Sequence, residues 1–167
     1  SITFGSHLLP NDLNNNRNGF VLHIDNNDNI TWAKHIGDIN TGGSEYVQSL
    51  TLNQNNKLLV AGLFDYWIPA NQTTFIKEYS TSGVLNATIE SDSMDHYFSY
   101  AYGVRISTNS NGEIYLLTAH NTHQVPNYYV FNGVALNAIN GSSQILYKLD
   151  ASFNHLDAIN FGTMSDN

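Results

Sequence analysis

Residues 19–37 read GFVLHIDNNDNITWAKHIG, two apolar runs on either side of a turn rich in Asn and Asp. The same arrangement returns at 74–89 and again at 144–162. Asp150 follows Asp25 by 125 positions, and Gly162 follows Gly37 by the same number. Because two boundaries keep one offset, the match indicates an internal repeat.

A second pair of segments, 46–64 and 102–118, interleaves with the first set. Apolar and polar residues alternate in the first run of each segment, 47–52 and 104–107, which predicts strands that are buried on one face. The runs 58–64 and 114–117 are apolar throughout and predict strands buried on both faces. The turns between the runs are rich in Asn, Asp, Ser and Gly, the residues that tight turns favour.

Together these segments predict an all-β fold of antiparallel four-stranded blades, arranged as in a β-propeller and incomplete at about two and a half blades. Residues 1–37 would form a partial blade, an insertion hairpin plus strands three and four. Residues 38–91 would form a full blade. Residues 92–167 would form a second full blade with an insertion near 128–136, which resembles the segment 4–9.

The order and recurrence of these pieces resemble the bacterial β-propeller repeats of the SBBP class. The likeness lies in Phe20 to Asp25, the turn, Trp32 and Gly37, together with 50–64 and 131–136. The chain departs from the pattern at Asp157 and Ala158, where the tryptophan would stand. The resemblance implies four-stranded blades, an extracellular or cell-surface location, scaffold or adhesion roles, and no catalytic residues.

Composition argues against a nucleic-acid partner and against a transmembrane segment. The chain has six Lys and Arg against fourteen Asp and Glu, a net charge of -8, and no basic cluster. Nucleic-acid binding needs clustered cations to neutralise phosphates, so we expect no nucleic-acid partner. No apolar run approaches the length of a membrane helix, so we expect no transmembrane segment. Cysteine is absent, which removes disulfides and thiolate metal sites.

Two sets of residues are weak candidates for binding sites. Asp25, Asn27 and Asn29 place oxygen ligands at alternate positions, as a calcium loop does, but Ile30 stands where such a loop needs glycine. We interpret the segment as a hairpin turn and expect no metal or cofactor. Tyr66 and Trp67 lie in a predicted loop after a strand, where exposed aromatic rings could bind a protein or a glycan.

The remaining clusters of polar residues predict no catalysis. His120 and His123 fall in a predicted loop with no further ligands at metal-site spacing. Glu90, Asp92 and Asp95 lie between two strands and are typical of a solvated linker. We therefore assign no catalytic residue.

The sequence thus predicts a non-enzymatic scaffold or adhesion-type segment of a larger secreted or cell-surface protein. Two alternatives stay open: a lectin-like propeller that uses Tyr66 and Trp67, and part of a propeller enzyme with its catalytic residues elsewhere. The apolar faces of the end units should be covered by the rest of the chain or by another subunit, because repeat arrays need caps.

Overall fold

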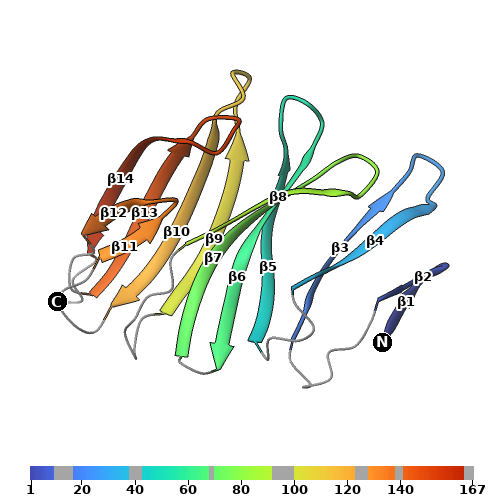
Figure 1. Ribbon diagram of the computed structural model, residues 1–167, viewed down its shortest axis with the longest axis horizontal. Coiled ribbons are helices and arrows are strands. Elements are labelled where there is room, and N and C mark those ends of the chain that lie inside the picture. The colour runs from blue at the N-terminus through green and yellow to red at the C-terminus, as the bar shows by residue number, and fades with distance from the viewer. Residues whose placement is uncertain are drawn as a thin grey trace.

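The computed structural model describes residues 1–9, 17–37, 43–67, 70–91, 100–122, 128–137 and 141–163. Every regular element within these ranges is a β-strand, and every strand pairs antiparallel with its neighbours (Figure 1). The predicted all-β, antiparallel class is therefore confirmed. The described sheets are open, with two or four strands each.

Two four-stranded sheets form the centre of the molecule, and in each the strands follow one another in chain order. The first sheet comprises β5 (Gly43–Leu52), β6 (Leu58–Trp67), β7 (Ala70–Tyr79) and β8 (Leu85–Glu90). The second comprises β9 (Tyr100–Thr108), β10 (Ile114–Thr122), β13 (Gly141–Leu149) and β14 (His155–Thr163).

Three two-stranded hairpins accompany these sheets: β1 (Ile2–Phe4) with β2 (His7–Leu9), β3 (Gly19–Ile24) with β4 (Ile30–Ile36), and β11 (Tyr128–Phe131) with β12 (Val134–Asn137). The β11–β12 hairpin lies between β10 and β13 in the chain, where the sequence predicted an insertion. Its Phe131 ring packs on Tyr147 at 5.2 Å, much as Phe4 packs on Phe20 at 4.9 Å. The two inserted hairpins thus meet their neighbouring strands in similar ways.

One turn recurs in five hairpins and fixes their register. Its first residue donates an amide hydrogen bond to the carbonyl of the fifth residue and accepts one from the amide of the fourth. The fourth residue has a positive φ, which gives a type I turn followed by a bulge. The first residues are Asp25, Asn53, Ser80, Asn109 and Asp150, and the fourth residues are Asp28, Asn56, Gly83, Gly112 and Phe153.

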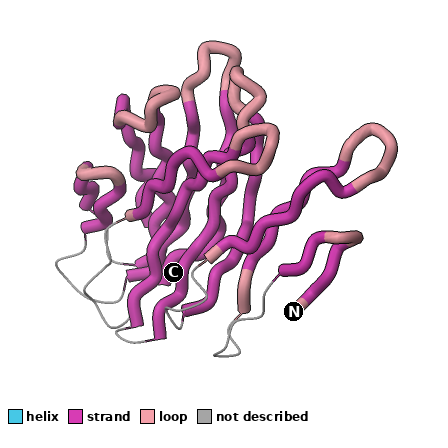
Figure 2. The backbone as a smooth tube through the Cα atoms, turned by 45° about the vertical axis from the view of Figure 1, so that its right-hand side comes forward, coloured by secondary structure: helices cyan, strands magenta, loops and turns pink. Residues whose placement is uncertain are grey.

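Strand β6 explains why the first sheet is buried on both faces. Leu59, Ala61 and Leu63 point into the larger apolar core, which the second sheet completes. Val60 and Phe64 point the other way, into a smaller core shared with β3 and β4. The apolar run 58–64 therefore behaves as predicted, and Figure 2 shows the two four-stranded sheets side by side with the β3–β4 hairpin on one flank.

The run 114–117 differs from its prediction. Ile114 and Leu116 are buried in the larger core, whereas Tyr115 and Leu117 are only half-buried. The reason is geometric: the described residues place no further sheet against the outer face of β10. The second sheet is thus buried on one face only within the described part of the chain.

Hydrogen bonds that involve side chains join β5 to β9, the first strand of the next sheet. Gln48 Oε1 accepts a hydrogen bond from the amide of Val104 at 2.6 Å, and Ser49 Oγ accepts one from Ile106 at 3.1 Å. Thr108 Oγ1 donates to the carbonyl of Leu52 at 2.8 Å. These bonds fix the two sheets against each other along their inner edges.

Candidate functional site

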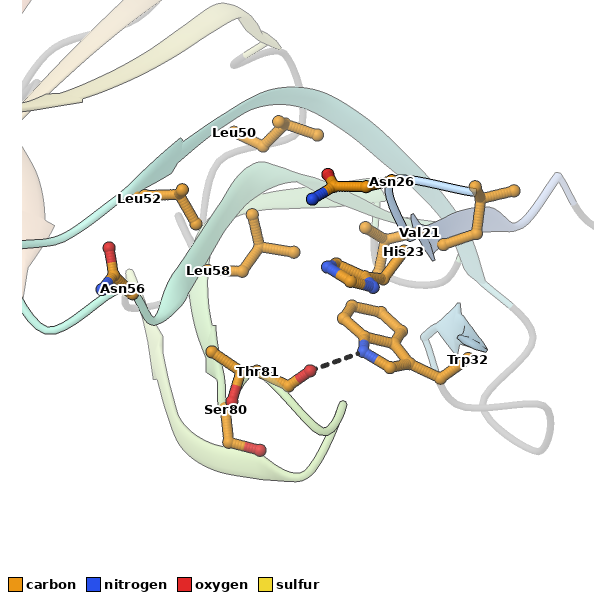
Figure 3. Close-up of a pocket in the computed structure, with 11 residues that line it drawn as sticks. Val21, His23, Asn26, Trp32, Leu50, Leu52, Asn56, Leu58, Ser80 and Thr81 are labelled. Carbon is orange, nitrogen blue, oxygen red and sulfur yellow. Dashed lines mark hydrogen bonds between the residues drawn. The ribbon is translucent and has the colours of Figure 1, made fainter. Parts of the chain in front are cut away.

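A groove of about 740 Å³ lies between the β3–β4 hairpin and the first sheet (Figure 3). Val21, His23 and Trp32 line it from the hairpin side, and Leu50, Leu52 and Leu58 line it from β5 and β6. Ahead of β3, the carbonyl of Arg17 accepts a 2.8 Å hydrogen bond from the amide of Glu45 in β5. Asn26, in the turn that follows β3, also lines the groove.

Trp32 is held rigidly at one side of this groove. Its Nε1 donates a 2.9 Å hydrogen bond to the carbonyl of Thr81, in the turn between β7 and β8. The indole stacks between His23, at 5.7 Å, and Tyr79, at 6.3 Å. Burial raises the pKa of Tyr79 to about 12, so this ring stays neutral at physiological pH. The exposed His23 ring is the part of this stack that reaches solvent.

The β5 wall of the groove is unusually apolar for a surface. Leu50 and Leu52 are 57% and 56% exposed. Counting from the shared turns at Asn53 and Asn109, the counterpart of Leu50 is Ile106, which is 6% exposed. The difference arises because the first sheet covers Ile106, whereas no described strand covers Leu50.

The β3 edge of the groove also differs from its counterparts. β3 pairs with β4 along one edge, and among the described strands none pairs along the other. The corresponding strands β7 and β13 each lie between two strands of their sheets. An edge with free amides and carbonyls is able to accept a further strand. The groove therefore combines an open strand edge with an apolar wall.

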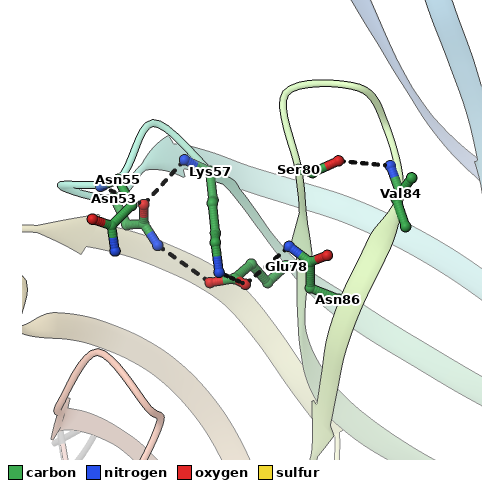
Figure 4. A network of polar contacts seen from close by, with 7 residues as sticks. All are labelled: Asn53, Asn55, Lys57, Glu78, Ser80, Val84 and Asn86. Carbon is green, nitrogen blue, oxygen red and sulfur yellow. Dashed lines mark hydrogen bonds and ion pairs between the residues drawn. The ribbon is translucent and has the colours of Figure 1, made fainter.

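A buried carboxylate lies on the other face of the first sheet (Figure 4). Glu78 accepts hydrogen bonds from Lys57 Nζ at 2.8 Å, and from Asn53 Nδ2 and Asn86 Nδ2 at 3.2 Å each. The second sheet has the same pair with its charges exchanged, since Lys148 Nζ lies 2.8 Å from Glu113 Oε1. Donors surround the Glu78 carboxylate, which indicates a stabilising role between strands.

The predicted calcium ligands build the turn between β3 and β4. The Asp25 carboxylate accepts hydrogen bonds from the amides of Asn29 at 2.9 Å and Asn27 at 2.8 Å, and these bonds lower the pKa of Asp25. Asn29 Nδ2 adds a bond at 3.3 Å. The described part of the chain brings no three His, Asp or Glu side chains together as a metal site would require.

Of the other predicted site residues, those that the structure describes lie at or near the ends of strands. Tyr66 and Trp67 belong to β6, where a loop was predicted, and pair with Asn71 and Ala70, but their side chains fall outside the described residues. His120 likewise belongs to β10 rather than to a loop. Glu90 ends β8 and is exposed, while His123, Asp92 and Asp95 lie outside the described residues.

The groove residues were missed at the sequence level because each one has the pattern of an ordinary strand residue. Aligning 50–58 with 106–114 from their shared turns pairs Leu50 with Ile106 and Leu58 with Ile114, and of the two segments only the second follows a four-stranded sheet. No known protein-family model matches the chain, and no curated protein matches it. No helix in the described ranges is long and apolar enough to cross a membrane.

Proposed function

We propose that this chain is a non-enzymatic scaffold segment, a β-propeller-like array of a secreted or cell-surface protein that binds a polypeptide partner. The groove beside β3 is its binding site, and the occupant is a β-hairpin whose outer strand adds to the free edge of β3. Strand addition obtains affinity from main-chain hydrogen bonds and specificity from pockets for alternate side chains.

One observation carries this proposal: the contrast between Leu50 and its counterpart Ile106. At Ile106 the neighbouring hairpin β5–β6 supplies the covering surface, and Ser49 and Thr108 join the two hairpins by hydrogen bonds. At Leu50 the same kind of apolar surface is exposed to solvent. The molecule thus contains its own example of the structure that would fill the groove.

The four-stranded repeat and the resemblance to the SBBP class support the array and its extracellular setting. Both central sheets are chain-order meanders with the same turns, as propeller blades are. The low proportion of charged residues, 12%, and the abundance of Asn suit a turn-rich surface. In the glycan-binding alternative, the sugar would bind to Tyr66 and Trp67.

The experiment titrates the chain with a synthetic hairpin peptide of the sequence 100–122, the molecule's own β9–β10, and measures heat of binding by calorimetry. We expect saturable binding that Leu50→Asp with Leu52→Asp weakens about 10-fold or more, because two carboxylates would then be desolvated in the contact. The matched control is Leu8→Asp, since Leu8 is equally apolar and exposed but lies on β2.

Three results would count against the proposal: no binding of the peptide, equal loss of binding in the Leu8 control, or binding unaffected by the groove substitutions. Glycan binding that Trp67→Ala abolishes would favour the lectin alternative.

A further inference from the structure

The outer face of the second sheet carries a continuous row of apolar side chains. Leu117, Leu146 and Ile159 are neighbours across β10, β13 and β14 in the strand register, and Phe161 lies two residues beyond Ile159. Ile159 and Phe161 are 50% and 61% exposed, and Leu117 and Leu146 are half-buried. We call these four residues the C-terminal face.

The first sheet has an equivalent row of apolar side chains, and there the row is buried. Ala61, Ile76 and Ile89 are neighbours across β6, β7 and β8, and they occupy the positions of Leu117, Leu146 and Ile159 when both sheets are aligned on their turns. All three pack in the larger core, against the second sheet. The C-terminal face is thus the repeat of a face that is buried inside the same molecule.

The surface that buries this row also has a repeat, and it lies at the other end of the molecule. Ile145, Tyr147 and Leu149 of β13 supply the second sheet's side of the larger core. Counted back from the equivalent turns at Asp150 and Asp25, their counterparts on β3 are Phe20, Leu22 and Ile24. We call these last three residues the N-terminal face.

Side chains of the N-terminal face are exposed where their counterparts on β13 are buried. Phe20 and Ile24 are 44% and 53% exposed, whereas Ile145 and Leu149 are both fully buried at 0%. The described residues therefore present two different apolar faces, and these are repeats of the two faces that meet between the central sheets.

We propose that copies of this chain associate head to tail, with the C-terminal face of one copy packed on the N-terminal face of the next. The interface between the two central sheets provides the template for this contact. Such an interface is heterologous, because the two surfaces differ, so it leads to a ring if the rotation closes and to an open filament if it does not.

Charge gives the association a characteristic dependence on salt. Each copy has a net charge of -8, so copies repel one another at low ionic strength. The proposed contact is apolar and is not weakened by screening. Association should therefore become stronger, not weaker, as sodium chloride is added.

The test uses two variants of the full chain, each with one blocked face, in sedimentation-velocity experiments. Ile159→Lys with Phe161→Lys blocks the C-terminal face, and Phe20→Lys with Ile24→Lys blocks the N-terminal face. We expect the unmodified chain to form larger species as concentration rises, each variant alone to stay monomeric, and an equimolar mixture to form a dimer and nothing larger. The control Val84→Lys with Leu85→Lys, at exposed positions outside both faces, should associate like the unmodified chain.

Either variant associating with itself would overturn the proposal, because a self-complementary interface needs only one face. A mixture that stays monomeric would overturn it too. Threonine at the same positions provides milder variants if lysine perturbs folding, which far-ultraviolet circular dichroism reports. The C-terminal variant leaves β3 and the groove residues unchanged, so binding of the hairpin peptide should persist in that variant, which keeps this test separate from the proposed function.

Discussion

At the scale of single residues, the recurring turn shows how one side chain fixes a hairpin. Asp25 and Asp150 each accept two backbone amide hydrogen bonds, as Asn53 and Asn109 do at the same position of their turns. Asn and Asp serve equally because only a side-chain oxygen is required. They differ in one respect, since the carboxylate can be protonated.

This difference predicts a dependence of stability on pH. Hydrogen bonds lower the pKa values of Asp25 and Asp150 below their ordinary value of 3.8. The stability that they contribute is therefore complete above 3.8 and is lost as the pH falls through the lowered folded-state value. Replacing both with Asn should flatten the acid loss of stability, measured by urea unfolding at about pH 7 and about pH 3. An unchanged acid loss in the variant would contradict this role of the carboxylates.

Gly83 and Gly112 form a matched pair of turn glycines that tests how Trp32 packs against the turn between β7 and β8. Gly83 and Gly112 have φ of +76° and +79°, so alanine at either costs about 1–2 kcal/mol of backbone strain. A Cβ at Gly83 would also lie 2.7 Å from the Trp32 ring, whereas one at Gly112 meets only the flexible side chain of Gln54. We expect Gly83→Ala to be the more destabilising change in urea unfolding. Equal losses would indicate that the β3–β4 hairpin does not pack on this turn.

At the scale of the elements, the exchanged ion pairs show that the two central sheets use one cross-strand position in the same way. Lys57→Met should cost about 1–3 kcal/mol, because Glu78 is buried and loses its charged partner. Combining Lys57→Glu with Glu78→Lys should restore most of that loss, since it reproduces the arrangement of Glu113 and Lys148. Urea unfolding of the single and double variants measures both effects; a double variant less stable than Lys57→Met would show that the two positions are not equivalent.

Strands and turns were predictable because their signals are local. Apolar alternation and short polar turns predicted most of the hairpins, including the insertion near 128–136, from a few residues at a time. The partial exposure of Leu117, the exposure of Leu50 and the inclusion of Trp67 in β6 were not predictable in this way. They depend on which sheet lies next to which, and on pairing with a strand that follows in the chain.

At the scale of the whole molecule, the described residues form a stack with two unlike apolar ends and an open groove near one of them. Phe20 at one end and Phe161 at the other are 44% and 61% exposed, which is high for phenylalanine side chains on a protein surface. These surfaces are repeats of interior ones, and we propose that a polypeptide covers them.

The most direct test is sedimentation and urea unfolding of residues 1–167, expressed without other segments, over a micromolar range of concentration. We expect association or precipitation, with an unfolding midpoint that rises with protein concentration because assembly stabilises the folded chain. A soluble monomer that unfolds cooperatively, with a midpoint independent of concentration, would contradict it.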